Sequence, residues 1–433
     1  MKYNFTTRFV KKLANLQLAI SLLFTIGLTI AIGTIIEQDQ SLAFYKENYP
    51  IDKPLFGFLT WKLVIFLNFD HLYTAWWFLM ILFLFAGSLI ACTFTTQLPS
   101  IKTFKLWKFY TQPKQFKSLV VNSKVQSETS NAFVYNCNNE KYHFFRQRKK
   151  GYAYSGLLGR VGPIVVHASI VLLLLGSTLG SFGGYAAQEL IPRGEISHIQ
   201  NVTKFGDLSY LPQTISCRIN DFWITYTKEL KTEQFYSDLS ILDSNGKEIT
   251  RKTIFVNEPL IFKDIVLYQT DWDIVGLKLR LTDKKDFQIP LKKITKEGRK
   301  FWLGSLTLGQ NSTDKVTILV NDLKGQLLIY DSTGKFLEEV SIGGQINLNS
   351  EFKIQTLEYI TSTGLQIKSD PGIFTVYFSF LLLMISIYVS FFTYSQIWLF
   401  EGINFITVGG KSNRAVLFFQ EEFRKILKRT NTA

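Results

Sequence analysis

The chain has 433 residues, of which 47% are hydrophobic and 19% are charged, and it carries a formal net charge of +14 at pH 7. This length is too great for one compact core and indicates two or three structural units, while a mean hydropathy of only +0.11 indicates apolar segments diluted by a large polar part. The three cysteines, Cys92, Cys137 and Cys217, form no CxxC pair, which excludes a disulfide scaffold, a zinc ribbon and a thioredoxin-like redox motif.

Four apolar segments are long enough to cross a membrane. A spanning helix needs about 20 apolar residues, because the hydrocarbon core is about 30 Å thick and a helix rises about 1.5 Å per residue. The segments that qualify are 16–36, 75–94, 161–182 and 373–392. Each must be helical, since only a helix satisfies its own backbone groups in lipid. The basic N-terminal flank and the length of the first apolar run predict an uncleaved span rather than a signal peptide.

The region between the first two spans contains a fifth apolar run, Leu55–Phe69, which is shorter and has Lys62 at its centre. We expect an amphipathic helix here that lies in the membrane interface or packs on the spans. Trp76 and Trp77 open the second span beside His71. We interpret the two tryptophans as an interfacial aromatic belt and His71 as a packing or surface residue.

Basic residues gather in the N-terminal flank and in residues 98–160 and 393–433. Under the four-span count these segments share one side of the membrane, and the positive-inside rule identifies that side as the cytoplasm or stroma. The predicted divisions are 1–97 with the first two spans, a basic loop at 98–160, the third span, a domain at 183–370 in the periplasm or lumen, the fourth span, and a basic tail at 393–433. Because the basic residues flank spans, we expect the lipid bilayer and no nucleic acid as a partner.

The domain at residues 183–370 shows the patterns of strands. Residues 216–227 alternate and are rich in aromatic side chains, as strands are. Asn245-Gly246 predicts a two-residue hairpin turn, and a second turn is expected near Thr333-Gly334. No long helical period is present. The fold class predicted for the chain is therefore an α-helical membrane protein with four transmembrane helices and a large, β-rich extramembrane domain, arranged as an antiparallel sandwich or meander.

One segment of this domain concentrates aromatic and acidic side chains, among them Tyr268, Asp271, Trp272 and Asp273. Aromatic residues on a sheet face more often form core than a functional surface. The two carboxylates suggest acid–base chemistry only weakly, because no nucleophile or metal cluster accompanies them. The sequence contains no glycine-rich phosphate loop, GxSxG or HExxH motif, so nothing in this domain indicates a catalytic centre.

Among Asp, Glu, Lys, Arg and His residues, His167 is the only one within the four predicted spans. If the third helix begins at Val161, His167 lies roughly 10 Å into the bilayer. An ionisable residue at that depth needs a partner and is a functional-site hypothesis, because a neutral imidazole can bind a metal or haem iron. The alternative is a histidine that is hydrogen-bonded across helices and helps to pack Ser169, Gly176 and Gly180. We expect the remaining histidines, His143 and His198, to lie in polar loops and to be solvated.

Several motifs, taken in order, resemble the ResB family, the CcsB-type component of the system II pathway of c-type cytochrome biogenesis. The Arg-x-Gly-Pro-x-x-x-His pattern, which contributes Arg160, Gly162, Pro163 and His167, is the most specific. The matching segments are 33–38, 70–78, 160–169, 268–272, 370–377, 395–398 and 409–415. Together they extend over essentially the whole chain. Glu37 departs from the family pattern, because proline is expected at that position of the first motif.

The resemblance implies a role beside CcsA, a second polytopic membrane protein. Such proteins move haem across the membrane and attach it to the CxxCH cysteines of apocytochrome c. The family's membrane histidine corresponds to His167, whereas the tryptophan-rich haem-handling loop belongs to the partner, which makes this chain a non-catalytic subunit. A haem held by two histidines needs a second histidine at similar depth. We expect CcsA to supply it, or else a second copy of this chain.

A different class of function also fits the predicted layout, namely a membrane sensor or transporter accessory protein with an outer β domain. A transporter would show internal repeats or several polar groups at mid-membrane, and the sequence shows neither. A purely structural assembly factor fits if His167 is dispensable. The frequent Phe, Lys, Ile, Asn and Tyr residues favour a plastid origin and a thylakoid membrane with the large domain in the lumen, with a bacterial plasma or thylakoid membrane as the alternative.

Overall fold

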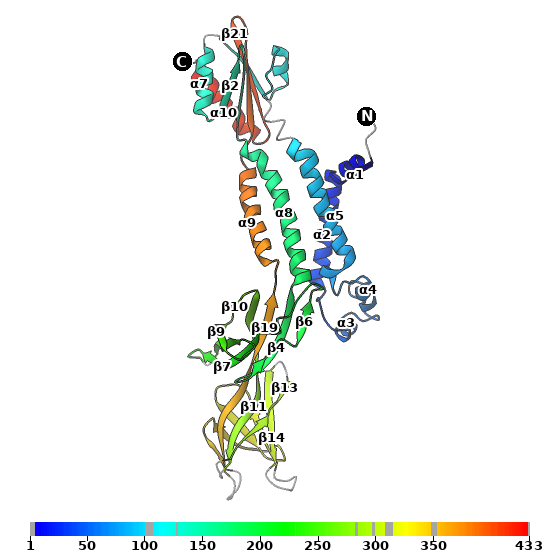
Figure 1. Ribbon diagram of the computed structural model, residues 1–433, viewed down its shortest axis with the longest axis vertical. Helices are drawn as coiled ribbons and strands as arrows, with labels where there is room; N and C mark the ends of the chain where they lie inside the picture. Colours follow the sequence, from blue (N-terminus) through cyan, green and yellow to red (C-terminus); the bar gives the residue numbers. More distant parts are fainter. Residues whose placement is uncertain are drawn as a thin grey trace. The chain divides into compact units, whose positions relative to one another are not determined.

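The computed structural model describes residues 5–99, 107–126, 129–229, 231–281, 285–296, 299–307, 315–347 and 353–431. The chain divides into two compact units (Figure 1). The terminal unit contains both chain ends, Met1–Thr178 and Gly372–Ala433, and the inserted unit is Leu179–Pro371. The inserted unit therefore interrupts the terminal unit between its third and fourth long helices.

Within the described residues, four helices are long and apolar enough to cross a membrane, which confirms the four predicted spans. They are α2 (Leu16–Ile35), α5 (Trp76–Cys92), α8 (Leu158–Gly183) and α9 (Ile373–Ser390). Helix α5 continues through a π-helical turn, η2 (Thr93–Gln97), so the second span ends at Gln97. Helix α8 begins three residues before the predicted start. Arg160 is consequently inside the third span with His167.

Short helices surround the spans. They are α1 (Phe5–Leu13), α3 (Leu42–Asn48), α4 (Trp61–Phe66) and η1 (Leu72–Thr74). The predicted fifth apolar run is helical only in α4, because Leu55 and Leu59 pair in a tight turn before it. Val64 of α4 is buried against Tyr45 and Tyr49. This segment therefore packs into a small core of its own.

The predicted basic loop and basic tail fold together into one five-stranded antiparallel sheet. Its order is β1 (Val121–Gln126), β21 (Phe405–Ser412), β20 (Ser395–Glu401), β3 (Lys150–Ser155) and β2 (His143–Gln147). The helices α7 (Ser130–Asn139) and α10 (Val416–Asn431) pack their phenylalanines on one face, and η3 (Pro113–Ser118) packs on the other. His143 thus lies in a strand rather than a loop. Lys102 and Lys105 of the basic loop lie outside the described residues.

The inserted unit consists of antiparallel sheets, as predicted. The seven-stranded sheet has β10 (Leu260–Phe262), β11 (Ile265–Leu281), β19 (Lys353–Ser369), β4 (Tyr185–Pro192) and β6 (Val202–Phe205) in order, with β12 (Asp286–Pro290) on β11 and β18 (Gln345–Asn347) on β19. The four-stranded sheet is β5 (Ile196–Ser197), β7 (Ser216–Tyr226), β8 (Thr232–Leu242) and β9 (Glu248–Phe255). The five-stranded meander is β13 (Lys292–Lys296), β14 (Arg299–Thr307), β15 (Lys315–Val320), β16 (Gln326–Tyr330) and β17 (Phe336–Ser341).

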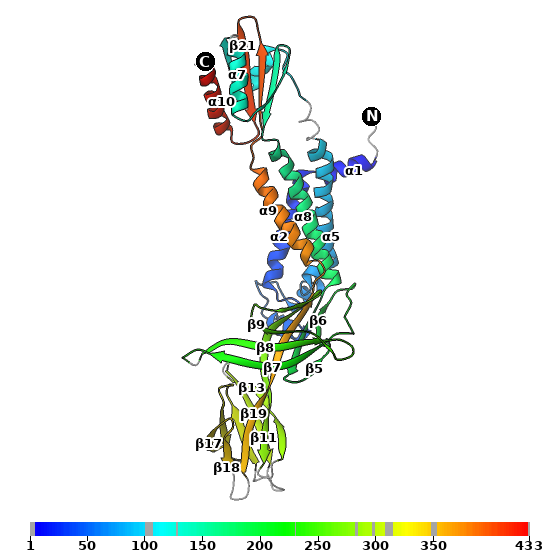
Figure 2. The same ribbon diagram turned by 60° about the vertical axis from the view of Figure 1, so that its left-hand side comes forward.

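The two longest strands, β11 and β19, connect two separate cores. They pair along their whole length and run through the unit together (Figure 2). One end of the pair packs against the four-stranded sheet around Ile219 and Leu239, and the other packs against the meander around Trp302 and Ile318. The unit is therefore a pair of sandwiches that share two strands.

Both predicted hairpin turns are present, but each is longer than a two-residue turn. The Gly246 N–H donates to the carbonyl oxygen of Asp243 at 3.0 Å, and the Asp243 N–H donates to the carbonyl oxygen of Lys247 at 2.9 Å. Asp331 and Gly334 repeat this pattern. The two glycines have φ of +77° and +82°, which is the left-handed position that follows a type I turn in a three-residue hairpin loop.

Candidate functional site

His167 lies in α8 and contacts the end of the second span. It is nine residues after Leu158, or roughly 13 Å along the helix axis. Its Nδ1 atom is 3.1 Å from Thr93 Oγ1, and its Nε2 atom is 3.2 Å from Gln97 Nε2. Thr93 and Gln97 are the first and last residues of the π-helical turn η2. Polar side chains at this one turn therefore reach both ring nitrogens of the histidine.

The neighbouring groups determine which nitrogen carries the proton. The Thr93 hydroxyl donates to the carbonyl oxygen of Leu89 at 2.8 Å, so toward His167 it acts as an acceptor and Nδ1 carries the hydrogen. The Gln97 amide nitrogen can only donate, so Nε2 presents its lone pair. Both neighbours are consistent with the same neutral tautomer, assigned from the hydrogen-bond network. This is the form in which an imidazole binds a metal through Nε2.

A cavity of ≈310 Å³ adjoins His167 between α5, η2 and α8. Apart from His167 and Thr93, its walls are apolar. They are formed by Ile90, Phe94, Ala168, Val171, Leu172 and Leu175. Ligand pockets in proteins have volumes of about 300–1,000 Å³ and are mostly apolar with a few placed polar groups. The site therefore has the size and lining of a pocket for an apolar ligand that ends in one coordinating group.

Gln97 covers the nitrogen that a metal would need. Its amide nitrogen contacts Nε2, whereas its Oε1 atom is buried and has no hydrogen-bond partner within the described part of the chain. A buried acceptor without a partner costs free energy. The Gln97 side chain is therefore stabilised only through its amide nitrogen. Coordination at Nε2 requires Gln97 to rotate away. π-helical turns are frequent at functional sites.

The donor set at His167 suits haem iron rather than a bare ion. No group of three or more His, Cys, Asp or Glu side chains that could hold a metal ion occurs among the described residues. A single imidazole beside apolar walls does suit an iron that already has four ligands from a porphyrin. The residues present therefore fit one axial face of a haem.

Gly162 and Arg160 of the Arg-x-Gly-Pro motif contact α9 and the segment that follows it. A Cβ atom on Gly162 would lie 2.2 Å from Ser390 Oγ and 2.8 Å from Ser390 Cα, so only glycine lets α8 and α9 approach this closely. The Arg160 guanidinium lies 4.9 Å from the centre of the Tyr394 ring. Pro163 is inside α8 and has no N–H to donate to the helix. Gly162 and Arg160 therefore contact the fourth span and the residues that follow it.

Trp76 and Trp77 are far from His167. They open α5, and Thr93 follows Trp76 by seventeen residues, or about 25 Å along the helix. Trp77 donates to the carbonyl oxygen of Leu67 at 2.9 Å and ties the end of α4 to α5, while Trp76 is 69% exposed. The two tryptophans thus lie at the start of the second span, apart from His167.

Sequence reasoning gave no role to Gln38, which connects the first two spans. Its amide nitrogen donates to the carbonyl oxygens of Gly33, Ile36 and Phe69, and its Oε1 accepts from the N–H of Leu72. Beside it, His71 Nδ1 lies 2.6 Å from Asp39 Oδ1. The motifs at 33–38 and 70–78 therefore meet. Their proximity in space was not evident from spacing, since the two lie on either side of a long loop.

Tyr268, Asp271 and Trp272 lie in the inserted unit and have structural contacts. Trp272 packs between Phe222 at 6.2 Å and Trp302 at 5.3 Å, which joins the two cores. Asp271 is exposed and pairs with Lys300 at 3.5 Å, and Tyr268 lies on β11 under the Lys368 ammonium group. The neighbouring Gln269 is buried and accepts from Thr363 at 2.7 Å. The segment is thus a junction inside the sheet.

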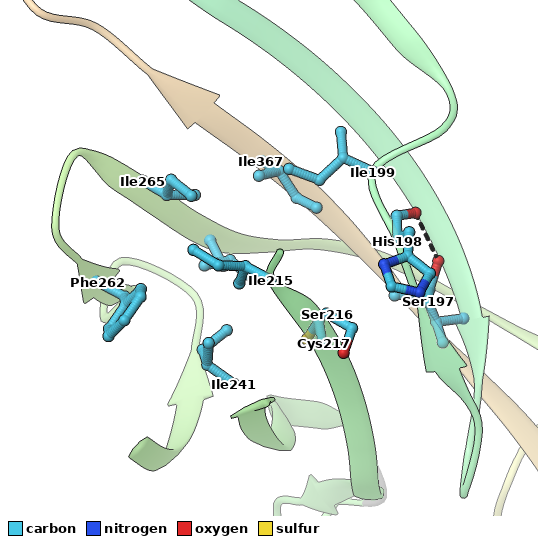
Figure 3. A pocket seen from close by; sticks show the side chains of 12 residues that line it. Ser197, His198, Ile199, Ile215, Ser216, Cys217, Ile241, Phe262, Ile265 and Ile367 are labelled. Carbon is cyan, nitrogen blue, oxygen red and sulfur yellow. Dashed lines mark hydrogen bonds between the residues drawn. The ribbon is translucent and has the colours of Figure 1, made fainter. Parts of the chain in front are cut away.

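A second cavity, in the inserted unit, has His198 on its rim (Figure 3). It is lined mainly by isoleucines and has a volume of only ≈20 Å³, which is space for about one water molecule. His198 itself is exposed. Cys217 also lines this cavity, and burial raises the pKa of its thiol to about 12. The thiol therefore stays protonated near neutral pH, and the cavity is far too small for a haem.

Comparison with known proteins identifies the family. The model of the ResB-like family matches residues 16–327 and 322–424. The chain belongs to the ResB-like family. Among its relatives is the cytochrome c biogenesis protein Ccs1 of Emiliania huxleyi, 53% identical over 98% of this chain and 96% of that protein. The Ccs1 protein of Thalassiosira pseudonana is 42% identical over 96% and 99%, and the CcsB protein of Trichormus variabilis is 42% identical over 98% and 93%. The resemblance that the motifs indicated is confirmed for this ResB-like chain.

Proposed function

We propose that this ResB-like protein acts in cytochrome c biogenesis as a membrane subunit that holds haem, with His167 as one axial ligand of the iron. The observation that carries the proposal is a neutral imidazole within a membrane helix, with Nε2 unprotonated, on a residue that lines an apolar cavity of ≈310 Å³. The relatives named above are cytochrome c biogenesis proteins. Haem is an apolar macrocycle that requires this kind of surrounding.

Three side chains have distinct roles in this proposal. His167 offers Nε2 to the iron. The Thr93 hydroxyl accepts a hydrogen bond from Nδ1–H, which holds the ring in the tautomer that binds metal and increases its basicity. Gln97 covers Nε2 in the absence of haem and rotates away when the iron approaches. The apolar side chains of α5 and α8 exclude water from the bound macrocycle.

The second axial ligand comes from a partner. The sequence has four histidines in all, and His71 lies at the opposite end of the second span from the Thr93–Gln97 turn. We propose that a CcsA-type membrane protein supplies the second histidine, in a thylakoid membrane. A second copy of this chain is the alternative source. The size and the subunit ratio of the haem-loaded complex distinguish a CcsA-type partner from a second copy of this chain.

We further propose that the inserted unit docks the CcsA-type partner or apocytochrome c on the lumenal side. The unit is well suited to a deletion test, because Tyr185 and Ser369 are ladder partners at its two ends. A short glycine–serine linker can therefore replace it and leave α8 and α9 in place. We expect partner binding to persist and cytochrome c assembly to be lost. Normal assembly without the unit would contradict a docking role.

The haem proposal is tested by His167→Ala in the complex co-purified with its partner. Ser169→Ala is the matched control, because Ser169 is buried on the same helix and bonds only to the carbonyl oxygen of Val165. We expect the His167 variant to lose most of its haem absorption and the Ser169 variant to retain it. Equal haem content in the two variants, with normal cytochrome c assembly, would refute the assignment.

A further inference from the structure

The helix α10 opens with three exposed apolar residues. These are Val416, Leu417 and Phe418, of which Leu417 and Phe418 are 77% and 67% exposed. The same helix anchors itself to the sheet through Phe419 and Phe423, both fully buried. Packing of α10 therefore does not require its first turn to be apolar. A contiguous exposed apolar patch indicates a surface that meets a membrane or another molecule.

Hydrogen bonds hold the start of α10 beside the end of the fourth span. Arg414 Nη1 donates to the carbonyl oxygen of Ser390, the last residue of α9, at 3.0 Å. Asn413 donates its N–H to the carbonyl oxygen of Tyr394 at 3.1 Å and accepts from the N–H of Tyr394 at 2.9 Å. Leu417 follows Arg414 by three residues. The apolar turn is thus tied to the membrane end of the sheet.

One residue turns the chain from the sheet into the helix. Ala415 has φ of +47°, a left-handed conformation that residues with a Cβ atom rarely adopt. It directly follows Arg414 and directly precedes α10. Because the reversal takes a single residue, the first turn of α10 stays at the level of the strand end, next to α9.

We infer that Leu417 and Phe418 insert into the interface of the bilayer that α9 crosses, with Arg414 at the level of the headgroups. Phe391, the residue after α9, is 74% exposed, so apolar surface continues from the span toward α10. Lys411 and Arg414 flank the patch and are exposed. Apolar side chains beside basic ones are the composition of interfacial membrane contacts. This anchor would fix the terminal sheet against the membrane, whatever the ligand of His167.

The same sheet provides a control position at its other end. Ile403 lies at the tip of the β20–β21 hairpin and is 93% exposed. The strand β20 has seven residues, so this tip is about 20 Å from the membrane end of the sheet. Ile403 and Leu417 are therefore both exposed and apolar, but only Leu417 is expected to contact lipid.

The test measures lipid contact with a fluorescent label in lipid nanodiscs of phosphatidylcholine and phosphatidylglycerol. Leu417→Cys and Ile403→Cys are each made in full-length protein with Cys92→Ala, and a polarity-sensitive dye is attached; Cys137 and Cys217 are buried and stay unlabelled. Nitroxide-bearing lipids should quench the dye at 417 at least about five-fold more than at 403, as expected for a side chain in the interface. Aqueous iodide should show the reverse order.

Equal quenching by the nitroxide lipids at the two positions would overturn the inference. Protection of position 417 from both quenchers would also overturn it, because the patch would then be covered by protein, such as a second copy of the chain. Labelling is done on folded protein, and both substituted side chains are exposed. Unchanged thermal unfolding of each labelled variant confirms that the comparison concerns the same fold.

Discussion

Helix α8 packs tightly against α9 on one face and borders a cavity on the other. Toward α9, Gly159 and Gly162 remove side chains so that the backbones meet. Toward α5, His167 adjoins ≈310 Å³ of space and is joined to η2 by hydrogen bonds. Lipid supplies no hydrophobic force between helices, so close packing and hydrogen bonds hold them. The glycines thus let α8 and α9 approach closely, whereas on the side toward α5 the α8 residues Ile170, Val171 and Leu174 pack on the helix core and His167 adjoins open space.

The largest expected effect is on the packed face. Gly162→Ala places a methyl group against the Ser390 backbone and should destabilise the protein by about 1–3 kcal/mol, because an overpacked contact forces the backbones apart. Thermal unfolding of the detergent-purified protein measures this. Gly27→Ala is the control, since no described atom beyond its chain neighbours and the adjoining helix backbone lies within 4 Å of the added methyl. If the two variants unfold at the same temperature, the close contact between α8 and α9 does not stabilise the protein.

On the cavity face, Thr93→Val should weaken haem binding without unfolding the protein. Valine keeps the shape of threonine but cannot accept the hydrogen bond from Nδ1–H, and loss of such an outer partner typically lowers metal affinity about 10–100-fold. Haem titration followed by absorption spectroscopy measures the change. Thr95→Val is the matched control, because the Thr95 hydroxyl bonds to Ala91 and Thr96 and not to His167. A similar loss in both variants would contradict a specific role for Thr93.

A smaller effect of opposite sign is expected at Gln97. Gln97→Leu removes the amide that covers Nε2, together with the buried Oε1 that lacks a partner within the described chain. Haem affinity should rise about five-fold, because one hydrogen bond worth about 1 kcal/mol no longer has to break. The same titration measures it. Weaker binding in this variant would mean that Gln97 contacts the ligand rather than covering its site.

Much of the terminal unit was predictable from the sequence, but its contacts across long separations were not. Hydropathy located four spans, and an ionisable residue within one of them drew attention to His167. Gln97 was missed as a partner of His167 because it lies beyond the predicted end of the second span, in the π-helical turn that continues α5. Polar residues at a span's end have no hydropathy signal that distinguishes a ligand's neighbour from a solvated terminus.

The sheet built from residues 121–155 and 395–412 was missed for a related reason. Each segment alone reads as a basic flank, and pairing of β3 with β20 joins positions about 240 residues apart in the chain. Register between such segments depends on tertiary packing that a local pattern does not contain. In the inserted unit, alternation and turn residues are local signals, and they predicted its antiparallel strands. The position of Trp272 between two cores followed from the shared strands β11 and β19 and not from its motif.

The most direct test of the central claim is chemical rescue at His167. His167→Gly in the complex with its partner removes the proposed ligand and leaves space for added imidazole beside Thr93 and Gln97. We predict that haem absorption is lost in this variant and returns, with the spectrum of a bis-imidazole iron, when imidazole is added. A variant that keeps its haem spectrum without imidazole would contradict the claim that His167 binds the iron.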